Sequence, residues 1–298
     1  MPPISGLPGY IYFAGDPGTN VNVVYGSFNG QSPKNITLNS DGLGLVSIPS
    51  FSGNGDLVIS ERGVEITSSK PISCSFQNYQ AWTASATSIL PFDNTSYEYY
   101  ICPPLNQGFR GFSPPTITVV STEDSNTLLL TNLSTGAVST LNLNKLESFS
   151  YSTPNTRISG KYTDNTIIKL NSTKKIAVFT SLECFVYVGA CNSQLSQIYG
   201  SEYFDTKFAV PKTLNKNYSD VIKILSINNN NDIYINGDLI TTLSQYSTYE
   251  YDMTNPAGVI VESTYPIMLY NTRKGGDSGE PGDASISIVL PQKLLQKK

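Results

Sequence analysis

A ten-residue phrase that occurs three times is the feature that most constrains how this chain can fold. It occupies residues 63–72, 167–176 and 258–267. Each copy has apolar residues at its second, fourth and last positions, and a Ser followed by Ser or Thr in the middle. The copies lie roughly 90 to 105 residues apart, a period too long for a solenoid unit and suited to a small β-module. The chain is therefore expected to contain three related modules.

The sequence on either side of each copy also repeats. An alternating strand followed by turn formers precedes each copy, at residues 21–25, 116–120 and 221–225. An apolar strand follows each copy. The predicted fold class is all-β, with three tandem antiparallel modules of about 90–105 residues that are β-sandwich-like. The module boundaries are placed at 9–96, 97–202 and 203–291, followed by a C-terminal tail at 292–298.

The strand that opens each module leads to a further prediction. Residues 97–101 and 205–210 open the second and third modules, and residues 9–13 resemble them. The last strand of the third module would otherwise leave an unpaired edge, so the N-terminal strand at 9–15 is expected to pack there and close the modules into one unit. The alternative is a strand donated by a neighbouring subunit. The core is expected to contain the apolar phrase residues Val64, Ile66, Ile72, Ile168, Leu170, Ile176, Val259, Val261 and Ile267.

Charge and hydropathy exclude two classes of partner. The net charge is −4 at pH 7 and the sequence pI is about 4.9, so no positive field is present to bind nucleic acid. No apolar stretch approaches the 18 or more residues of a membrane span. The first residues show no apolar leader segment, so either a leader has been removed or the protein is made without crossing the secretory membrane.

Catalysis is not expected, because the sequence contains no histidine. Residues 276–281 nearly match the nucleophile loop of trypsin-like proteases, but Ser278 has no imidazole to take its proton. We therefore interpret this segment as a Gly-rich loop and expect no hydrolase activity. The chain also has no Cys-x-x-Cys pair, and neither a metal site nor a cofactor is predicted.

The four cysteines suggest two disulfides. Cys184 and Cys191 are close in sequence with Gly189 between them and could bridge a short loop. Cys74 either pairs with Cys102 or is a small buried hydrophobe on a strand face. Oxidised cysteines would indicate an extracellular compartment, and free thiols an intracellular one.

Two other residue types bear on function. Five sequons, at Asn35, Asn94, Asn132, Asn171 and Asn217, permit glycosylation, although a chain this rich in Asn, Ser and Thr contains about that number by chance. The 19 tyrosines crowd some strands, notably at 97–100 and 246–251. Tyrosine suits binding interfaces, and it is also an ordinary β-strand residue.

The ordered set of motifs resembles the N-terminal domain of the IgGFc-binding protein family, from about Val21 to Pro291. The features that carry the resemblance are the Gly-Val-x-Ile phrase at 63–72 with its copies, the Glu-Asp-Ser-Asn-Thr run at 123–127, the stretch from Cys184 through Cys191 to Gly200, and the closing Leu-Pro-Gln at 290–292. The resemblance implies an extracellular, β-rich adhesion or matrix-type module without catalytic activity.

Two functions are therefore weighed. The first is a structural or adhesion module of an extracellular matrix, mucus-like layer or cell surface, with other proteins or glycans as partners. The second is a structural protein of a particle assembled inside a cell, such as a virion surface or fibre protein, in which the chain self-assembles. The missing leader, the low charge, the Asn-rich loops and the Tyr-rich strands fit the second. An enzyme is the third and least favoured class.

Overall fold

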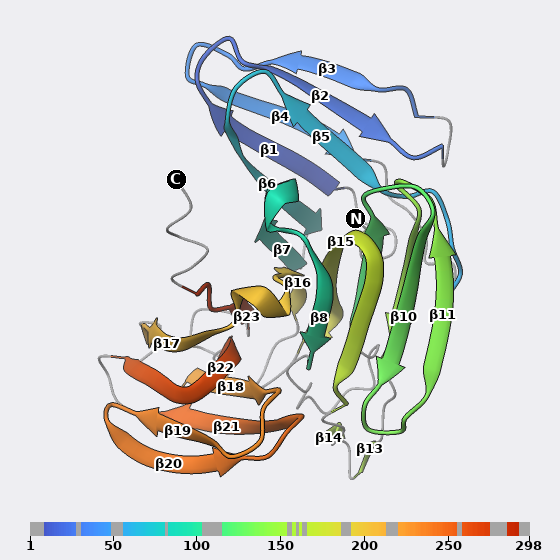
Figure 1. Cartoon of the computed structure of the whole chain (residues 1–298). Helices are drawn as coiled ribbons and strands as arrows, with labels where there is room; N and C mark the ends of the chain where they lie inside the picture. Colours follow the sequence, from blue (N-terminus) through green and yellow to red (C-terminus); the bar gives the residue numbers. More distant parts are fainter. Residues whose placement is uncertain are drawn as a thin grey trace.

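The computed structural model has an all-β fold built from antiparallel sheets (Figure 1). It describes residues 9–27, 31–48, 56–80, 83–102, 115–153, 157–158, 161–162, 166–185, 192–212, 220–254, 258–274 and 285–291. We call Gly9–Ser88 unit 1, Ser96–Ile198 unit 2 and Asp205–Ile288 unit 3.

Unit 1 consists of two sheets that share one apolar core. The first has the order β4-β1-β6-β7 and the second the order β3-β2-β5. Alternation explains which side chains face inward, because Ile11 and Phe13 on β1 are buried while Tyr12 between them is exposed. The strands are β1 (Gly9–Gly15), β2 (Asn20–Tyr25), β3 (Lys34–Thr37), β4 (Leu43–Ile48), β5 (Val64–Ser68), β6 (Ile72–Gln80) and β7 (Thr83–Ser88).

Unit 2 repeats the strand order of both sheets of unit 1 and adds one strand, β8, beside β15. Its sheets read β12-β9-β15-β16 and β11-β10-β15-β8, so that β15 belongs to both. The strands are β8 (Ser96–Ile101), β9 (Thr116–Ser121), β10 (Asn126–Asn132), β11 (Val138–Leu143), β12 (Ser148–Ser152), β15 (Ile168–Phe185) and β16 (Asn192–Ile198). A small ribbon of β13 (Arg157–Ile158) and β14 (Lys161–Tyr162) stands apart, and short 3-10 turns lie at Phe92–Asn94 and Ser201–Tyr203.

Unit 3 has the same order as unit 2, namely β21-β18-β22-β23 and β20-β19-β22-β17. The strands are β17 (Asp205–Val210), β18 (Asp220–Ser226), β19 (Asn231–Ile235), β20 (Asp238–Leu243), β21 (Ser247–Met253), β22 (Val259–Arg273) and β23 (Ser285–Ile288). A turn at Asn236-Gly237 joins β19 to β20, and both residues have positive φ, 53° and 93°.

The repeated phrase marks the point where a strand crosses from one sheet to the other. In each copy the middle serine bonds to the carbonyl two residues later: Ser68 Oγ to Lys70 at 2.7 Å, Ser172 Oγ to Lys174 at 2.7 Å and Ser263 Oγ to Tyr265 at 2.8 Å. This local bond satisfies a carbonyl that the bend removes from the ladder. The strand continues through the bend in β15 and β22, whereas in unit 1 it is divided into β5 and β6.

The predicted core is correct for six of the nine phrase residues. Ile168, Leu170, Ile176, Val259, Val261 and Ile267 are buried. Val64, Ile66 and Ile72 are only half-buried and pack at the margin of the unit 1 core. The physical reason for the difference at β5 is a strand that units 2 and 3 have and the described part of unit 1 lacks.

The predicted alignment of the strands before the phrase is wrong. Residues 9–13 match 97–101 and 205–210 in sequence, and those residues form β8 and β17. In the structure, however, β1 occupies the position in its sheet that β9 and β18 occupy in theirs. The expected closure of unit 3 by this strand is also wrong, because β1 pairs with β4 and β6 inside unit 1. The alternating pattern of residues 9–13 and 97–101 is the same, and pattern alone cannot distinguish a central strand from an edge strand.

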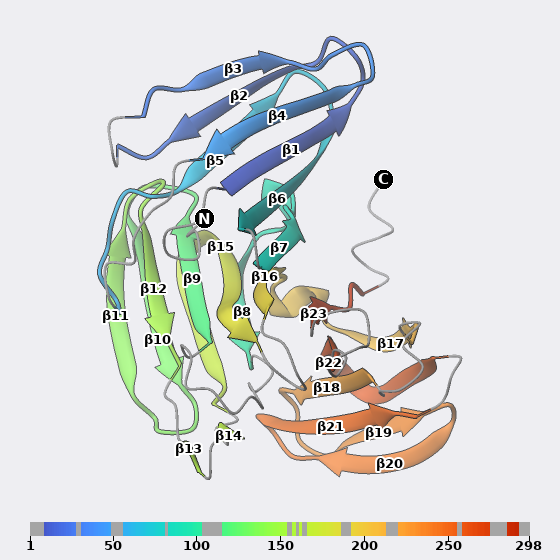
Figure 2. The same ribbon diagram turned by 180° about the vertical axis from the view of Figure 1, so that it is seen from behind.

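The edge of β23 is covered by unit 2 instead. The last strands of the three units, β7, β16 and β23, gather at the centre of the molecule (Figures 1 and 2). Gln194 on β16 accepts a bond from Ile286 N at 2.9 Å, and Gln197 accepts one from Leu90 N at 2.8 Å. Two glutamine side chains on β16 therefore satisfy backbone groups on either side of it.

The units also share their cores and one edge. One apolar cluster combines Tyr99 and Ile117 of unit 2 with Met268 of unit 3, and Phe179 of unit 2 lies in the cluster of unit 1. Residues 56–62 of unit 1 run along β12, where Leu57 N bonds to Ser150 O at 2.7 Å. A segment of one unit thus makes isolated bridges to the edge of another unit's sheet.

Candidate binding surface

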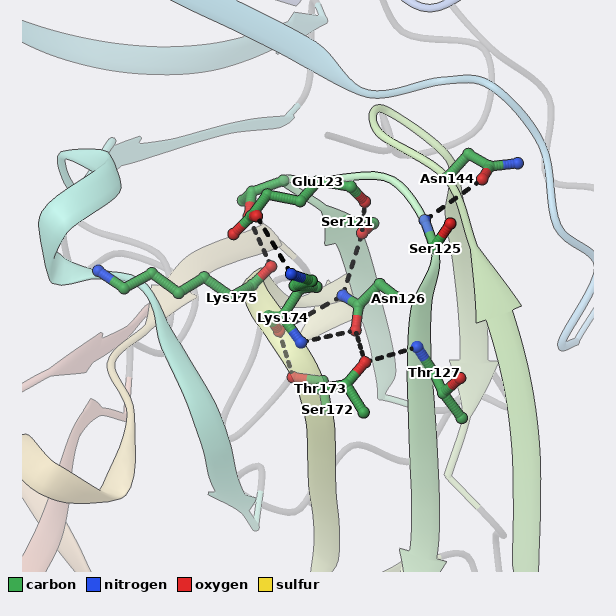
Figure 3. A network of polar contacts seen from close by, with 11 residues as sticks. Ser121, Glu123, Ser125, Asn126, Thr127, Asn144, Ser172, Thr173, Lys174 and Lys175 are labelled. Atoms are coloured by element: carbon green, nitrogen blue, oxygen red, sulfur yellow. Dashed lines mark hydrogen bonds and ion pairs between the residues drawn. The ribbon is translucent and has the colours of Figure 1, made fainter.

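A polar network at the bend of β15 is the first group of side chains to test as a functional site (Figure 3). Asn126 lies at its centre and is fully buried. Its Nδ2 donates to Ser121 Oγ at 3.0 Å and to the Lys174 carbonyl at 3.4 Å, and its Oδ1 accepts from Lys174 N at 3.0 Å. Every polar atom of this amide is engaged by its own sheet, so it presents nothing to a substrate.

The same network recurs in unit 3. Asn231 Nδ2 donates to Ser226 Oγ at 2.9 Å and to the Tyr265 carbonyl at 3.1 Å, and its Oδ1 accepts from Tyr265 N at 2.9 Å. The ion pair of Lys174 with Glu123 at 3.8 Å is specific to unit 2. Because the shared part is the amide clamp on the bend, we conclude that the network stabilises the sheet crossing.

Among the described residues, a metal ion would be held by a cluster of acidic, cysteine or histidine side chains. Among those residues, no group of three or more His, Cys, Asp or Glu could hold a metal ion. Ser278 and its loop at 276–281 lie outside the described residues.

The structure has Cys74 and Cys102 as free thiols, so the predicted bridge between them is not formed. They belong to different apolar clusters, Cys74 at the margin of the unit 1 core and Cys102 within the core shared by units 2 and 3. Burial raises the pKa of Cys74 to about 11. Burial also raises the pKa of Cys102, and the neighbouring Lys223 ammonium offsets part of that shift. The Cys184 and Cys191 side chains lie outside the described residues.

Both described thiols are expected to react slowly with iodoacetamide at pH 8 in the native protein. The reactive species is the thiolate, and raising the Cys74 pKa from 9.0 to about 11 lowers its thiolate fraction at pH 8 about a hundredfold. Peptide mass spectrometry after a timed pulse measures modification at each cysteine. In guanidinium chloride both should react rapidly, and a mass consistent with a 74–102 disulfide under either condition would contradict the free-thiol state.

The sequons lie in different environments. Asn35 is exposed, and Asn94 and Asn171 are half-buried. Asn132 is 2% exposed, and its Oδ1 accepts bonds from Ser134 N at 3.0 Å and Thr135 N at 3.2 Å. The side chain of Asn132 therefore has a turn-forming role that leaves little room for a glycan. Asn217 lies outside the described residues.

Most tyrosines of the crowded strands serve the core. Tyr99 and Tyr100 are buried, and the Tyr100 ring stacks on that of Tyr246 in unit 3 at 5.8 Å between ring centroids. Tyr249 and Tyr251 pack against the unit 3 core. For these positions the interpretation as ordinary strand residues is correct.

An exposed apolar face does occur, on unit 1. Tyr12 lies directly opposite Leu45 across the β1–β4 pair, and Leu43 is the next outward residue on β4. They are 42%, 50% and 53% exposed. We call the outward residues of β1, β4 and β6 the β1–β4 face: Tyr10, Tyr12, Ala14, Leu43, Leu45, Ser47, Ser73, Ser75 and Gln77.

The β1–β4 face carries no charged side chain. Binding interfaces are typically depleted of charge and enriched in tyrosine at their centre. The face can therefore bind another macromolecule by burying apolar area, with serine and glutamine hydroxyl and amide groups at its side for hydrogen bonds.

Sequence reasoning missed this face, although a signal was present. Residues 10–13, Tyr-Ile-Tyr-Phe, carry large apolar or aromatic side chains on both faces of the strand. The apolar residues on the second face, Tyr12 with Leu43 and Leu45, become neighbours only through the β1–β4 register. A strand pattern with apolar residues on both faces was the available indication.

Comparison with known proteins gives one match. A family model described as IgGFc binding protein matches residues 85–297, more than two thirds of the chain. The match begins within β7 and includes units 2 and 3. Searches of curated proteins and of solved structures returned no match. Within the described residues, no helix has the length and apolar character needed to span a membrane.

Proposed function

The chain belongs to the IgGFc-binding protein family, and on this basis we propose that it is a non-catalytic protein-binding module of an extracellular matrix, mucus-like layer or cell surface. The observation that carries the proposal is the charge-free β1–β4 face with Tyr12, Leu43 and Leu45 exposed. The family match supports an extracellular binding role over the virion alternative.

The physical argument rests on what exposed apolar groups do in water. Contiguous exposed apolar residues are uncommon on proteins that bind nothing, and they mark interaction sites. Tyr12 offers a large amphipathic ring that loses little conformational entropy on binding. Leu43 and Leu45 on the edge strand beside it would supply apolar area without a desolvated charge.

The test is binding of the purified chain to two immobilised probes, the Fc fragment of immunoglobulin G and a secreted mucin. We expect the substitution Leu45→Asp to weaken binding to the recognised probe by about tenfold or more, since a charge in the centre of an apolar interface is desolvated without a partner. Leu129→Asp is the matched control, because Leu129 is 42% exposed on unit 2. Absence of binding to both probes, or equal loss in the two variants, would overturn the proposal.

A further inference from the structure

The β1–β4 face has two halves of different chemistry. On one side of the central strand β1 it is apolar, through the two leucines of β4. On the other side it is polar and uncharged, because the register places Gln77 of β6 opposite Tyr10 and Ser75 opposite Tyr12. We call these four residues the polar half of the face. Tyr12 is exposed and the other three are half-buried, so all four are in reach of a ligand.

The polar half keeps its hydrogen-bonding capacity unused. Within the part of the chain that the structure describes, its hydroxyls and its amide make no hydrogen bond. Polar side chains on other described strands bond across the sheet: Thr37 Oγ1 donates to Asn20 Oδ1 at 2.9 Å in unit 1, and Thr127 Oγ1 donates to Asn142 Oδ1 at 2.9 Å in unit 2. A similar pair joins β20 to β19 in unit 3. The donors and acceptors of the polar half are therefore available to a ligand.

The polar half offers side chains alone, because β1 and β6 are interior strands of their sheet. β1 pairs with β4 and β6, and β6 pairs with β1 and β7. A polypeptide strand that adds to a sheet needs the unpaired backbone groups of an edge, so it cannot be bound here in that way. The ligand of the polar half must instead be recognised by ring faces and by uncharged donors and acceptors.

The spacing of the two tyrosines suits a chain of linked sugars. Two residues separated by one position on a strand have their side chains on the same face, about 7 Å apart. A pyranose ring has an apolar C–H face, which packs on an aromatic ring, and a rim of hydroxyl groups that donate and accept hydrogen bonds. Successive sugar rings therefore match Tyr10 and Tyr12, and the amide of Gln77 and the hydroxyl of Ser75 lie beside the two rings.

Charge indicates which sugars fit. The polar half contains no cation to pair with a carboxylate or sulfate, and the net charge of the chain is −4. Lys34 Nζ donates to the Ser47 carbonyl at 3.1 Å, so this ammonium lies at β4, and β1 separates it from β6. An acidic sugar on the polar half would be desolvated without a counter-charge, which disfavours it relative to a neutral one.

We propose that the polar half of the β1–β4 face binds a neutral sugar chain carried by the partner protein, with the two tyrosine rings stacked on successive sugar rings and with Gln77 and Ser75 bonded to sugar hydroxyls. This inference rests on the function proposed above and specifies its partner as a glycosylated protein. The apolar half, with its two leucines, remains available for the polypeptide that carries the sugars.

The first test uses the immobilised secreted mucin before and after enzymatic removal of its sugars. We expect removal of all sugars to weaken binding of the full chain by about tenfold or more. Treatment with sialidase, which removes only acidic sugars, should leave binding as strong as before. Undiminished binding to the stripped polypeptide would overturn the inference and leave the proposed function standing. Loss of binding after sialidase treatment would show that an acidic sugar is recognised, which would also overturn it.

The second test uses the neutral oligosaccharides released from the same mucin, so that no polypeptide is needed. Saturation-transfer NMR with the full chain is expected to show transfer of magnetisation to the ring protons of the sugars. Transfer to the released sugars, without binding of the Fc fragment or the intact mucin, would uphold the sugar site and count against the proposed function. Absence of transfer would overturn the sugar site.

Two substitutions at Tyr12 separate ring stacking from the burial of apolar area. Tyr12→Phe keeps the ring and should bind the released sugars within about twofold of the original chain, whereas Tyr12→Leu keeps an apolar group without the ring and should bind them about tenfold more weakly. Tyr97→Ala is the matched control, because it removes a tyrosine that is 50% exposed on unit 2, and it should leave binding unchanged. Circular dichroism checks that each variant is folded. Equal binding by Tyr12→Leu and Tyr12→Phe would contradict stacking and overturn the proposal.

Discussion

Replacing Tyr199 by alanine is expected to lower the free energy of unfolding by about 3–5 kcal/mol, the range for removal of a buried aromatic side chain. Tyr199 is 0% exposed, and its ring meets that of Phe204 edge-on at 6.1 Å between centroids. Its hydroxyl donates to Val289 O at 3.1 Å. The ring therefore lies between the end of unit 2 and the last strand of unit 3, and the cavity left by alanine would open the core that the two units share.

Chemical denaturation followed by circular dichroism measures this effect. Tyr199→Phe retains the ring and loses only the bond to Val289 O, so a cost of about 1–2 kcal/mol is expected. Tyr97→Ala removes a tyrosine that is 50% exposed and should cost less than about 1 kcal/mol. A cost for Tyr199→Ala close to that of Tyr97→Ala would show that the shared core is not a continuous one.

The second large effect is expected at the amide clamp. Asn126→Ala should lower the free energy of unfolding by about 2–4 kcal/mol, because it leaves buried partners on Ser121 and Lys174 without their bonds. Asn231→Ala should have a similar effect through Ser226 and Tyr265.

Asn144 provides the control for this prediction. It is exposed, and its single contact shown in Figure 3 is a long bond from Ser125 N at 3.4 Å. Asn144→Ala is expected to change stability by less than about 0.5 kcal/mol. If Asn126→Ala and Asn144→Ala have equal effects, the network does not stabilise the bend and its role must be sought elsewhere.

The sequence predicts the fold class and shows the three copies of the phrase, because both depend on local patterns. The serine of each phrase is visible in sequence, and its bond to the carbonyl two residues on is a local contact. The buried state of Ile168 and Leu170 follows from alternation. Family membership, inferred from motif order, is confirmed by the match over residues 85–297.

What could not be predicted depends on strand neighbours. The sequences of β1 and β8 alternate alike, but β1 has two partners and β8 has one. Val64 carries the same pattern as Ile168, and its lower burial reflects a missing neighbour rather than its own sequence. The β1–β4 face likewise requires the register of Tyr12 against Leu45. Long-range pairing of this kind is set by tertiary packing, which periodicity does not encode.

The position of β8 before its partner also affects how the chain is made. Ile101 pairs with Ile168, so β8 leaves the ribosome about 70 residues before the strand that receives it, which at about 5–20 residues per second is a wait of several seconds. Unit 1 ends at Ser88, and at that point its apolar cluster still lacks Phe179 and Leu195 of unit 2. Until β15 emerges, the nascent chain holds the aromatic strand β8 without the partner that buries Tyr99 and Ile101 in the finished fold.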